Sequence, residues 1–195
     1  AVDFGYGTVV MQAGEDYGIS REWMANIIHR IKSETSLAVT LSLGERPDED
    51  LIVWREAGAN RYLIRFETSN RDLYDRIHPP LGEHTSDRFA ILSNLKKLGY
   101  EVGSGIMIGI PGQTYEDLAR DILTFRKLDL DMIGVGPFIP HPETPLGQCL
   151  PDASAKQVPN TEQITYKVIA LTRLVCPEAN IPSTTALASL NKTDG

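Results

Sequence analysis

Short apolar runs alternate along the chain with longer segments of helical periodicity, and each run ends in a cluster of polar residues or glycines. The five runs with their clusters are Thr8–Met11 before Gln12–Asp16, Ala38–Leu41 before Ser42–Glu45, Arg61–Ile64 before Arg65–Thr68, Gly105–Ile108 before Gly109–Thr114, and Met132–Val135 before Gly136–Pro142. Short apolar runs bounded by glycine and polar residues are typical of buried strands. Because the carboxyl ends of parallel strands meet at one edge, we expect these clusters to form one active site.

The segments between the runs predict helices, because their apolar residues recur at helical spacing. The stripes are Trp23, Ile27 and Ile31; Leu51, Trp54 and Ala57; Phe89, Leu92, Leu95 and Leu98; and Leu118, Ile122 and Phe125, with a last helix near Gln163–Val175. Ser20 and Thr114 are good N-caps, and Asp117 completes a capping box with Thr114. Strands and helices therefore alternate, which indicates a parallel sheet with outer helices.

The sequence predicts about six parallel strands. They lie near Thr8–Ala13, Ala38–Leu43, Arg61–Phe66, Val102–Ile110, Met132–Ile139 and Thr184–Leu187. A closed (β/α)₈ barrel needs eight strands in roughly 250 residues. Periodicity alone therefore leaves two interpretations, a complete open α/β sheet and a partial TIM-type barrel.

Composition predicts one domain over residues 1–195 and excludes some functions. A chain of 195 residues that is 42% hydrophobic can bury one sizeable core. Its net charge of −7 and lack of a basic stripe argue against nucleic acid as a partner. No apolar run approaches membrane-spanning length and no secretory signal is visible, so we expect a cytoplasmic protein. Cys149 and Cys176 are too few for a disulfide framework or a thiolate metal site.

Six motifs in register resemble the radical S-adenosylmethionine (SAM) maturase of [FeFe]-hydrogenase, the HydE family. They are Gly5–Asp16, Ala38–Glu45, Gly58–Thr68, Gly105–Thr114, Gly134–Pro145 and Asn180–Ala186. The resemblance covers nearly the whole chain in order, and it favours the partial radical SAM barrel over the open sheet. Biotin synthase and methylornithine synthase share this architecture and are the nearest alternatives.

The resemblance implies an enzyme that binds SAM on a [4Fe-4S] cluster and cleaves it reductively to a 5′-deoxyadenosyl radical. In this maturase family the radical is thought to act on an iron-bound precursor of the hydrogenase cofactor. Gly14 and Glu15 match the family's glycine-glutamate motif, which meets the ammonium of SAM. A carboxylate suits that position because an ammonium offers three donors and a charge.

The resemblance also implies a set of further SAM-binding residues. Glu67 matches the acid that contacts the ribose, and Gln12 is expected to help orient the ligand. Arg88 matches an arginine that holds the SAM carboxylate, for which a guanidinium fork is well shaped. The strand from Gly105 to Gly109 would let adenine approach, with Met107 against its face, and Ile139 is expected to bind the same cofactor.

A second set of residues matches the lining of the family's internal cavity. It comprises Thr40, Ser42, Arg65, Thr184 and Thr185, whose hydroxyls and guanidinium can bind a carboxylate or an iron-bound cyanide. A strand arginine with apolar neighbours must face outward or find an anion, so Arg65 with the two threonines is the expected anion site.

No metal-binding or catalytic role is assigned to two positions, His141 and Phe66. His141 lies between two prolines with no second ligand at metal spacing, so a rigid loop is the preferred interpretation. Phe66 stands where close relatives are expected to carry a histidine, so no proton or ligand role is assigned there.

The largest departure concerns the cluster. The radical SAM signature Cys-x₃-Cys-x₂-Cys is missing, and Cys149 and Cys176 cannot replace three converging thiolates. We therefore expect a central part of the enzyme that is inactive alone, with no metal ligand of its own. The expected partners are a small-molecule or iron-complex precursor and the other hydrogenase maturases, a scaffold GTPase and a tyrosine-cleaving radical SAM enzyme. The alternatives left open are another radical SAM synthase, like biotin or methylornithine synthase, and a non-catalytic α/β binding module.

Overall fold

The computed structural model describes residues 1–78, 80, 85–149 and 156–190, and its chain divides into two compact units. Unit 1 comprises Ala1–Ile64 and Asp87–Gly103, and unit 2 comprises Arg65–Ser86 and Ser104–Gly195. The described part contains five strands in the hydrogen-bonded order β1-β2-β3-β4-β5. The predicted α/β class with parallel strands is confirmed, whereas the prediction of a single domain remains a prediction.

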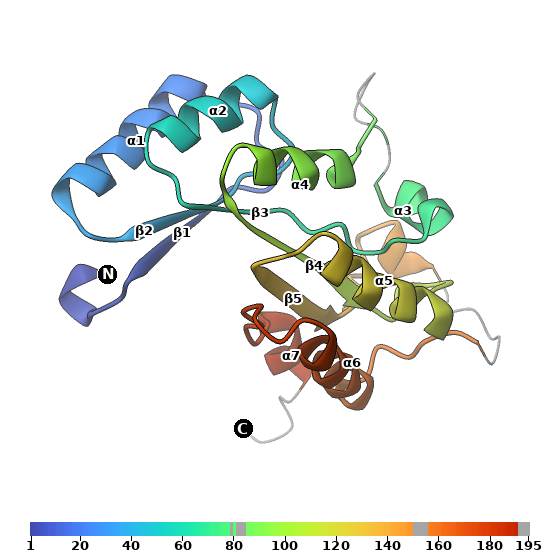
Figure 1. Ribbon diagram of the computed structural model, residues 1–195. Helices are drawn as coiled ribbons and strands as arrows, with labels where there is room; N and C mark the ends of the chain where they lie inside the picture. Colours follow the sequence, from blue (N-terminus) through green and yellow to red (C-terminus); the bar gives the residue numbers. More distant parts are fainter. Residues whose placement is uncertain (79, 81–84, 150–155, 191–195) are drawn as a thin grey trace. The chain divides into compact units, whose positions relative to one another are not determined.

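Unit 1 is built from parallel strands and the helices that connect them. Its elements are a 3₁₀ turn (Val2–Phe4), β1 (Thr8–Gln12), α1 (Arg21–Glu34), β2 (Ala38–Ser42), α2 (Asp48–Glu56), β3 (Arg61–Leu63), α4 (Arg88–Lys97) and the start of β4 (Glu101–Ile108). Thr8 pairs with Ala38, Thr40 with Arg61, and Arg61 with Glu101, all in parallel ladders. Figure 1 shows α1 and α2 side by side above β2.

Helix α1 begins as predicted but turns a different stripe inward. Ser20 accepts a hydrogen bond from the Trp23 backbone, which confirms the N-cap. Trp23, however, is 57% exposed, and the buried residues are Met24 and Ile28. Two apolar stripes one residue apart overlap in this helix, and contact with the sheet and with α2 selects the second. The prediction that the stripe beginning at Trp23 faces the core was therefore wrong.

The core of unit 1 is formed by the inner faces of the central strands and α2. Val39, Leu41, Leu51, Trp54 and Tyr62 are each 0% exposed. Full burial of side chains of this kind stabilises the folded state by about 1.5–3 kcal/mol each. This packing holds β2 and β3, which the second and third polar clusters follow in the sequence.

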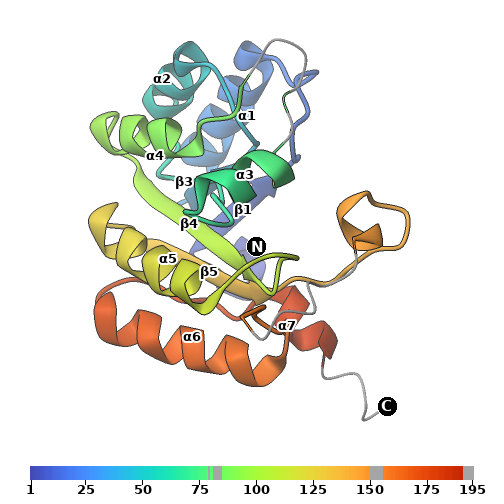
Figure 2. The same cartoon turned by 90° about the vertical axis from the view of Figure 1, so that its right-hand side faces the viewer.

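Unit 2 contains the rest of the sheet and its helices. Its elements are α3 (Arg71–Ile77), the remainder of β4, α5 (Tyr115–Lys127), β5 (Met132–Pro137), a 3₁₀ turn (Leu146–Gln148), α6 (Glu162–Val175) and α7 (Thr185–Leu190). Figure 2 shows α5 beside α6, with α6 and α7 next to β5. Leu118, Ile122 and Phe125 are buried and the Thr114–Asp117 capping box is formed, which confirms that prediction.

The sixth predicted strand, Thr184–Leu187, is wrong, because the segment begins helix α7. The Thr184 hydroxyl accepts from the Leu187 backbone at 3.4 Å, the geometry of a capping residue. Alanines and leucines follow, and these favour helix. The β-branched pair Thr184 and Thr185 therefore marks a helix start. Strands β3, β4 and β5 also end earlier than predicted, at Leu63, Ile108 and Pro137.

No helix in the described ranges is long and apolar enough to cross a membrane.

Candidate functional site

In unit 1 the polar clusters after β1 and β2 lie at the same end of the sheet, as predicted. Gln12 pairs with Ser42 in the parallel ladder, and the backbone of Ala13 donates to the Ser42 carbonyl at 3.2 Å. Gln12 is exposed, Ser42 is half-buried and Thr40 is 3% exposed. The two strand ends thus bring the loop that carries Glu15 next to the loop that carries Glu45.

Arg88 joins the acids of these two loops. Its Nε donates to Glu45 Oε1 at 2.9 Å, and its Nη2 lies 3.1 Å from Glu15 Oε1. The backbone of Glu45 donates to Glu15 Oε2 at 2.8 Å, which closes a ring of three residues. The structure therefore brings together Glu15 and Arg88, both predicted SAM ligands, and adds Glu45, for which the sequence predicted no role.

Gly44 allows the two loops to lie in contact. It adopts φ of +76°, and a β-carbon there would come within 2.3 Å of Glu15 Oε2 and 2.5 Å of the Gly14 carbonyl. Its own carbonyl accepts from the Tyr62 hydroxyl at 2.9 Å. Only glycine adopts this conformation readily and leaves this space free. Gly44 thus determines where Gly14 and Glu15 sit.

The segment that follows Glu15 is held by a buried ion pair. Arg46 lies 2.8 Å from Asp50, and their side chains are 5% and 7% exposed. Arg46 also donates to the carbonyls of Asp16 at 3.0 Å and Ile19 at 2.6 Å. Burial, followed by the nearby Glu15 and Glu45 carboxylates, raises the pKa of the Tyr17 phenol in the same segment.

In unit 2 the segment after β3 places Glu67 against β4. Glu67 has φ of +65°; its backbone donates to Gly105 at 3.0 Å and accepts from Met107 at 3.3 Å. Arg65 Nη2 lies 3.2 Å from Glu67 Oε2 and also donates to the Ile106 carbonyl. A non-glycine residue with positive φ is uncommon and often marks a functional site.

Two aspartates of α5 hold the residues that follow Glu67. Asp121 Oδ1 accepts from the backbone and hydroxyl of Ser69, and Asp117 Oδ1 accepts from the Asn70 amide at 3.0 Å. Burial raises the pKa of Asp121 to about 6, an effect that the bonds from Ser69 only partly oppose. Its Oδ2 is buried without a hydrogen-bond partner in the described part of the chain.

Packing explains two glycines, Gly105 in β4 and Gly109 directly after it. A β-carbon on Gly105 would come within 2.1 Å of the Gly134 carbonyl, and one on Gly109 would come within 2.5 Å of Asn160. Both glycines therefore allow contact with the protein's own backbone, whether or not adenine also approaches. Met107 is half-buried and Ile139 is 45% exposed, so their predicted contacts with SAM remain predictions.

The threonines of the predicted anion site and His141 take part in local structure. Thr184 is half-buried and its hydroxyl donates to the Val135 carbonyl at 3.3 Å, while Thr185 is exposed at the start of α7. His141 accepts from the Glu143 backbone at 3.3 Å in a turn, as expected of a rigid loop. Among the residues that the structure describes, no group of three His, Cys, Asp or Glu could hold a metal ion.

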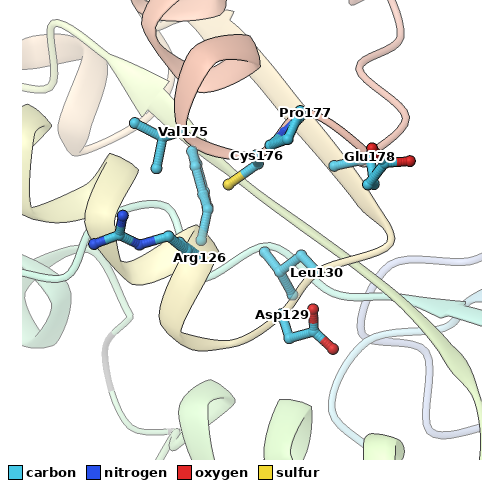
Figure 3. A pocket seen from close by; sticks show the side chains of 9 residues that line it. Arg126, Asp129, Leu130, Val175, Cys176, Pro177 and Glu178 are labelled. Atoms are coloured by element: carbon cyan, nitrogen blue, oxygen red, sulfur yellow. The ribbon is translucent and has the colours of Figure 1, made fainter.

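A separate pocket of about 170 Å³ lies at the carboxyl ends of α5 and α6. Figure 3 shows Arg126, Asp129 and Cys176 on its walls. Arg126 and Asp129 precede β5, and Asn180, which follows the wall that contains Cys176, pairs with Met132 at the start of that strand. The pocket therefore lies at the opposite end of β5 from the Gly136–Pro142 cluster. Burial raises the pKa of the Cys176 thiol, which disfavours a thiolate nucleophile or ligand. No predicted site residue lines this pocket.

Comparison with known proteins places these features in a family. The model of the radical SAM superfamily matches residues 2–143, and the chain belongs to that superfamily. It is 45% identical over 190 residues to the "[FeFe] hydrogenase maturase subunit HydE" of Thermotoga maritima, a match that spans 97% of the chain and 51% of the relative.

Other similar proteins are methylornithine synthases. The 3-methylornithine synthase of Methanosarcina acetivorans is 25% identical, over 96% of the chain and 51% of its own length. The crystal structure of methylornithine synthase (PylB) superposes with a TM-score of 0.73 at 26% identity, over 91% of the chain and 50% of that structure. The chain thus spans about half the length of the relatives it matches.

The superfamily implies SAM and a [4Fe-4S] cluster as cofactors, and the residues of this chain fit only the first. The Glu15 carboxylate and the Arg88 guanidinium form an ion pair, and their side chains are 32% and 16% exposed. They therefore offer partners for an ammonium and a carboxylate. Two cysteines cannot supply the three thiolates of the cluster motif. The chain therefore offers possible partners for the amino-acid group of SAM, and its sequence lacks the Cys-x₃-Cys-x₂-Cys motif that binds the cluster.

Proposed function

We propose that the intact protein is a radical SAM enzyme that takes part in assembling the [FeFe]-hydrogenase active-site cofactor, through reductive cleavage of SAM. The observation that carries this proposal is the 45% identity to HydE along 97% of the chain. The contact between Glu15 and Arg88 supports it, because both predicted partners of the SAM amino-acid group lie together. Cytoplasmic location and cooperation with the other hydrogenase maturases are part of the same proposal.

Each predicted residue has a task in this proposal. In unit 1, Glu15 binds the ammonium of SAM and Arg88 binds its carboxylate, while Gly14 completes the glycine-glutamate motif and Gln12 helps to orient the ligand. In unit 2, Glu67 accepts from the ribose hydroxyls, and Met107 and Ile139 contact the adenine. Thr40, Ser42, Arg65, Thr184 and Thr185 are proposed to bind an anionic or iron-bound precursor.

A second candidate function is that of a methylornithine-synthase-like enzyme. It is favoured by the PylB superposition, which covers 91% of the chain. A non-catalytic binding module is the third. The lower identity to the synthase, 25% against 45%, supports the maturase as the first choice.

The test uses the full-length protein with its iron–sulfur cluster reconstituted anaerobically. Reduction with dithionite in the presence of SAM is expected to release 5′-deoxyadenosine; no release would overturn the enzymatic proposal in favour of the binding module. Restoration of hydrogenase activity in a host that lacks its own HydE would then support the maturase. Formation of 3-methylornithine without such restoration would support the synthase.

A further inference from the structure

We propose that Glu45 is a positioning residue, which holds Arg88 in place while the amino-acid group of SAM opens the Glu15–Arg88 ion pair. The inference rests on the proposed SAM-binding function, and it assigns a role to a residue for which the sequence predicted none.

The three residues form a ring in unit 1, but their contacts differ in kind. The side chain of Glu45 binds Arg88 Nε at 2.9 Å, and its backbone N–H binds Glu15 Oε2 at 2.8 Å. Glu45 therefore touches both charges that are proposed to meet SAM. The contact between those charges themselves, at 3.1 Å, is the longest of the three.

Exposure indicates which contact opens. The side chain of Glu45 is 6% exposed, that of Arg88 is 16% exposed and that of Glu15 is 32% exposed. A ligand from solvent reaches Glu15 and the outer side of Arg88 and does not reach Glu45. A buried carboxylate that lost its cation would be strongly destabilised, so the Glu45–Arg88 pair persists.

The charges remain balanced when a zwitterion enters. The ligand ammonium replaces Arg88 beside Glu15, and the ligand carboxylate replaces Glu15 beside Arg88. Arg88 keeps one hydrogen bond to Glu45 throughout, which fixes the direction of its guanidinium plane. Because Glu45 shares Arg88, it also weakens the pair that the ligand must separate.

The test measures dissociation constants by calorimetry with two probes and the full-length reconstituted protein. S-adenosylhomocysteine carries the amino-acid group, whereas 5′-methylthioadenosine lacks it. Glu45→Gln keeps the shape and the acceptor oxygen but removes the charge. We expect this variant to raise the dissociation constant of S-adenosylhomocysteine roughly tenfold, which is within the range for loss of a hydrogen bond to a charged group. The dissociation constant of 5′-methylthioadenosine should change by less than about twofold.

Two further variants separate positioning from general structure. In an Arg88→Gln background, Glu45→Gln is expected to change the dissociation constant of S-adenosylhomocysteine by less than about twofold, because its effect passes through Arg88. The control is Glu49→Gln, at an exposed acid in the first turn of α2, and it should leave the dissociation constants of both ligands unchanged.

Several results would overturn the inference. Unchanged or tighter binding of S-adenosylhomocysteine to Glu45→Gln would show that Glu45 is dispensable or merely competes with the ligand carboxylate. An equal loss for both probes would show a general structural role. If neither probe bound the unmodified protein, the proposed SAM-binding function would fail first, and this inference with it.

Discussion

Arg65 Nη2 lies 3.2 Å from Glu67 Oε2, so the two residues form an ion pair within one short segment that follows β3. The sequence placed them in different sets, Glu67 with SAM and Arg65 with the substrate anion. The structure joins them, and a change to either residue alters the surroundings of the other. The proposed SAM and anion functions of this segment are therefore coupled.

Glu67→Ala is expected to weaken SAM binding by about 1–3 kcal/mol in the full-length protein, as for the loss of a hydrogen-bond partner in a largely buried site. Calorimetric titration with SAM measures this directly. Glu116→Ala, at an exposed position in the first turn of α5, is the matched control. Unchanged SAM affinity in Glu67→Ala would refute the ribose contact.

Gly44→Ala is expected to destabilise the chain more than Gly5→Ala does. Both glycines have positive φ, +76° and +72°, and this conformation alone costs roughly 1–2 kcal/mol for alanine. Only the new β-carbon at position 44 meets other atoms within 4 Å. Urea denaturation gives the two free energies of unfolding, and equal losses would mean that Glu15 and Gly14 do not depend on Gly44 for their place.

Arg46→Ala is expected to reduce the free energy of unfolding by about 1.5–3 kcal/mol, because Asp50 loses its buried partner and keeps only the ion pair with Arg21, at 2.7 Å. Faster hydrogen exchange in the segment from Asp16 to Ile19 should accompany it, since Arg46 binds both of their carbonyls. Arg30→Ala is the control: its ion pair with Glu34 has side chains 75% and 61% exposed, and its loss should cost less than about 1 kcal/mol. Similar losses of unfolding free energy in the two variants would contradict a stabilising role for the buried Arg46–Asp50 pair.

Asp121→Asn is expected to remove a pH dependence of stability. The pKa of Asp121 rises on folding from 3.8 to about 6. The folded state therefore binds the proton more tightly, and this stabilisation is present below about pH 4 and is lost as the pH rises through about 6. The free energy of unfolding of the unmodified chain relative to Asp121→Asn should thus fall by about 1–3 kcal/mol between pH 4 and pH 7.

Denaturant titrations at several pH values measure this difference. Glu116→Gln, an exposed acid of the same helix, is the control and should show no comparable trend. A constant difference between Asp121→Asn and the unmodified chain would show that this carboxyl is not protonated on folding.

Periodicity was sufficient to predict the five observed strands and most helices, because each buries one apolar run or stripe. The prediction failed where the sequence was equally compatible with two buried helix faces, or with a strand and a helix. In α1 the stripes that begin at Trp23 and Met24 overlap, and only contact with the sheet distinguishes them. At Thr184 and Thr185 β-branching favoured a strand, but a capping hydroxyl followed by good helix formers produced α7.

The candidate site was predictable to a similar extent. The Gly14–Glu15 motif and Arg88 could be found from the resemblance, and the structure brings Glu15 and Arg88 together. Glu45, Arg46 and Asp121 were missed, because their importance comes from burial and from contacts across many positions of the chain. The repeated Gly-Glu sequence after β1 and β2 was the signal that could have indicated Glu45.

The strand order β1-β2-β3-β4-β5 has a consequence for synthesis of the chain on the ribosome. Each of these five strands after the first pairs with the one translated just before it, and none of the five has to be inserted between two others. Loop closure is least unfavourable for such near neighbours. The sheet can therefore grow at one edge during translation, with each new strand meeting a partner that has already emerged.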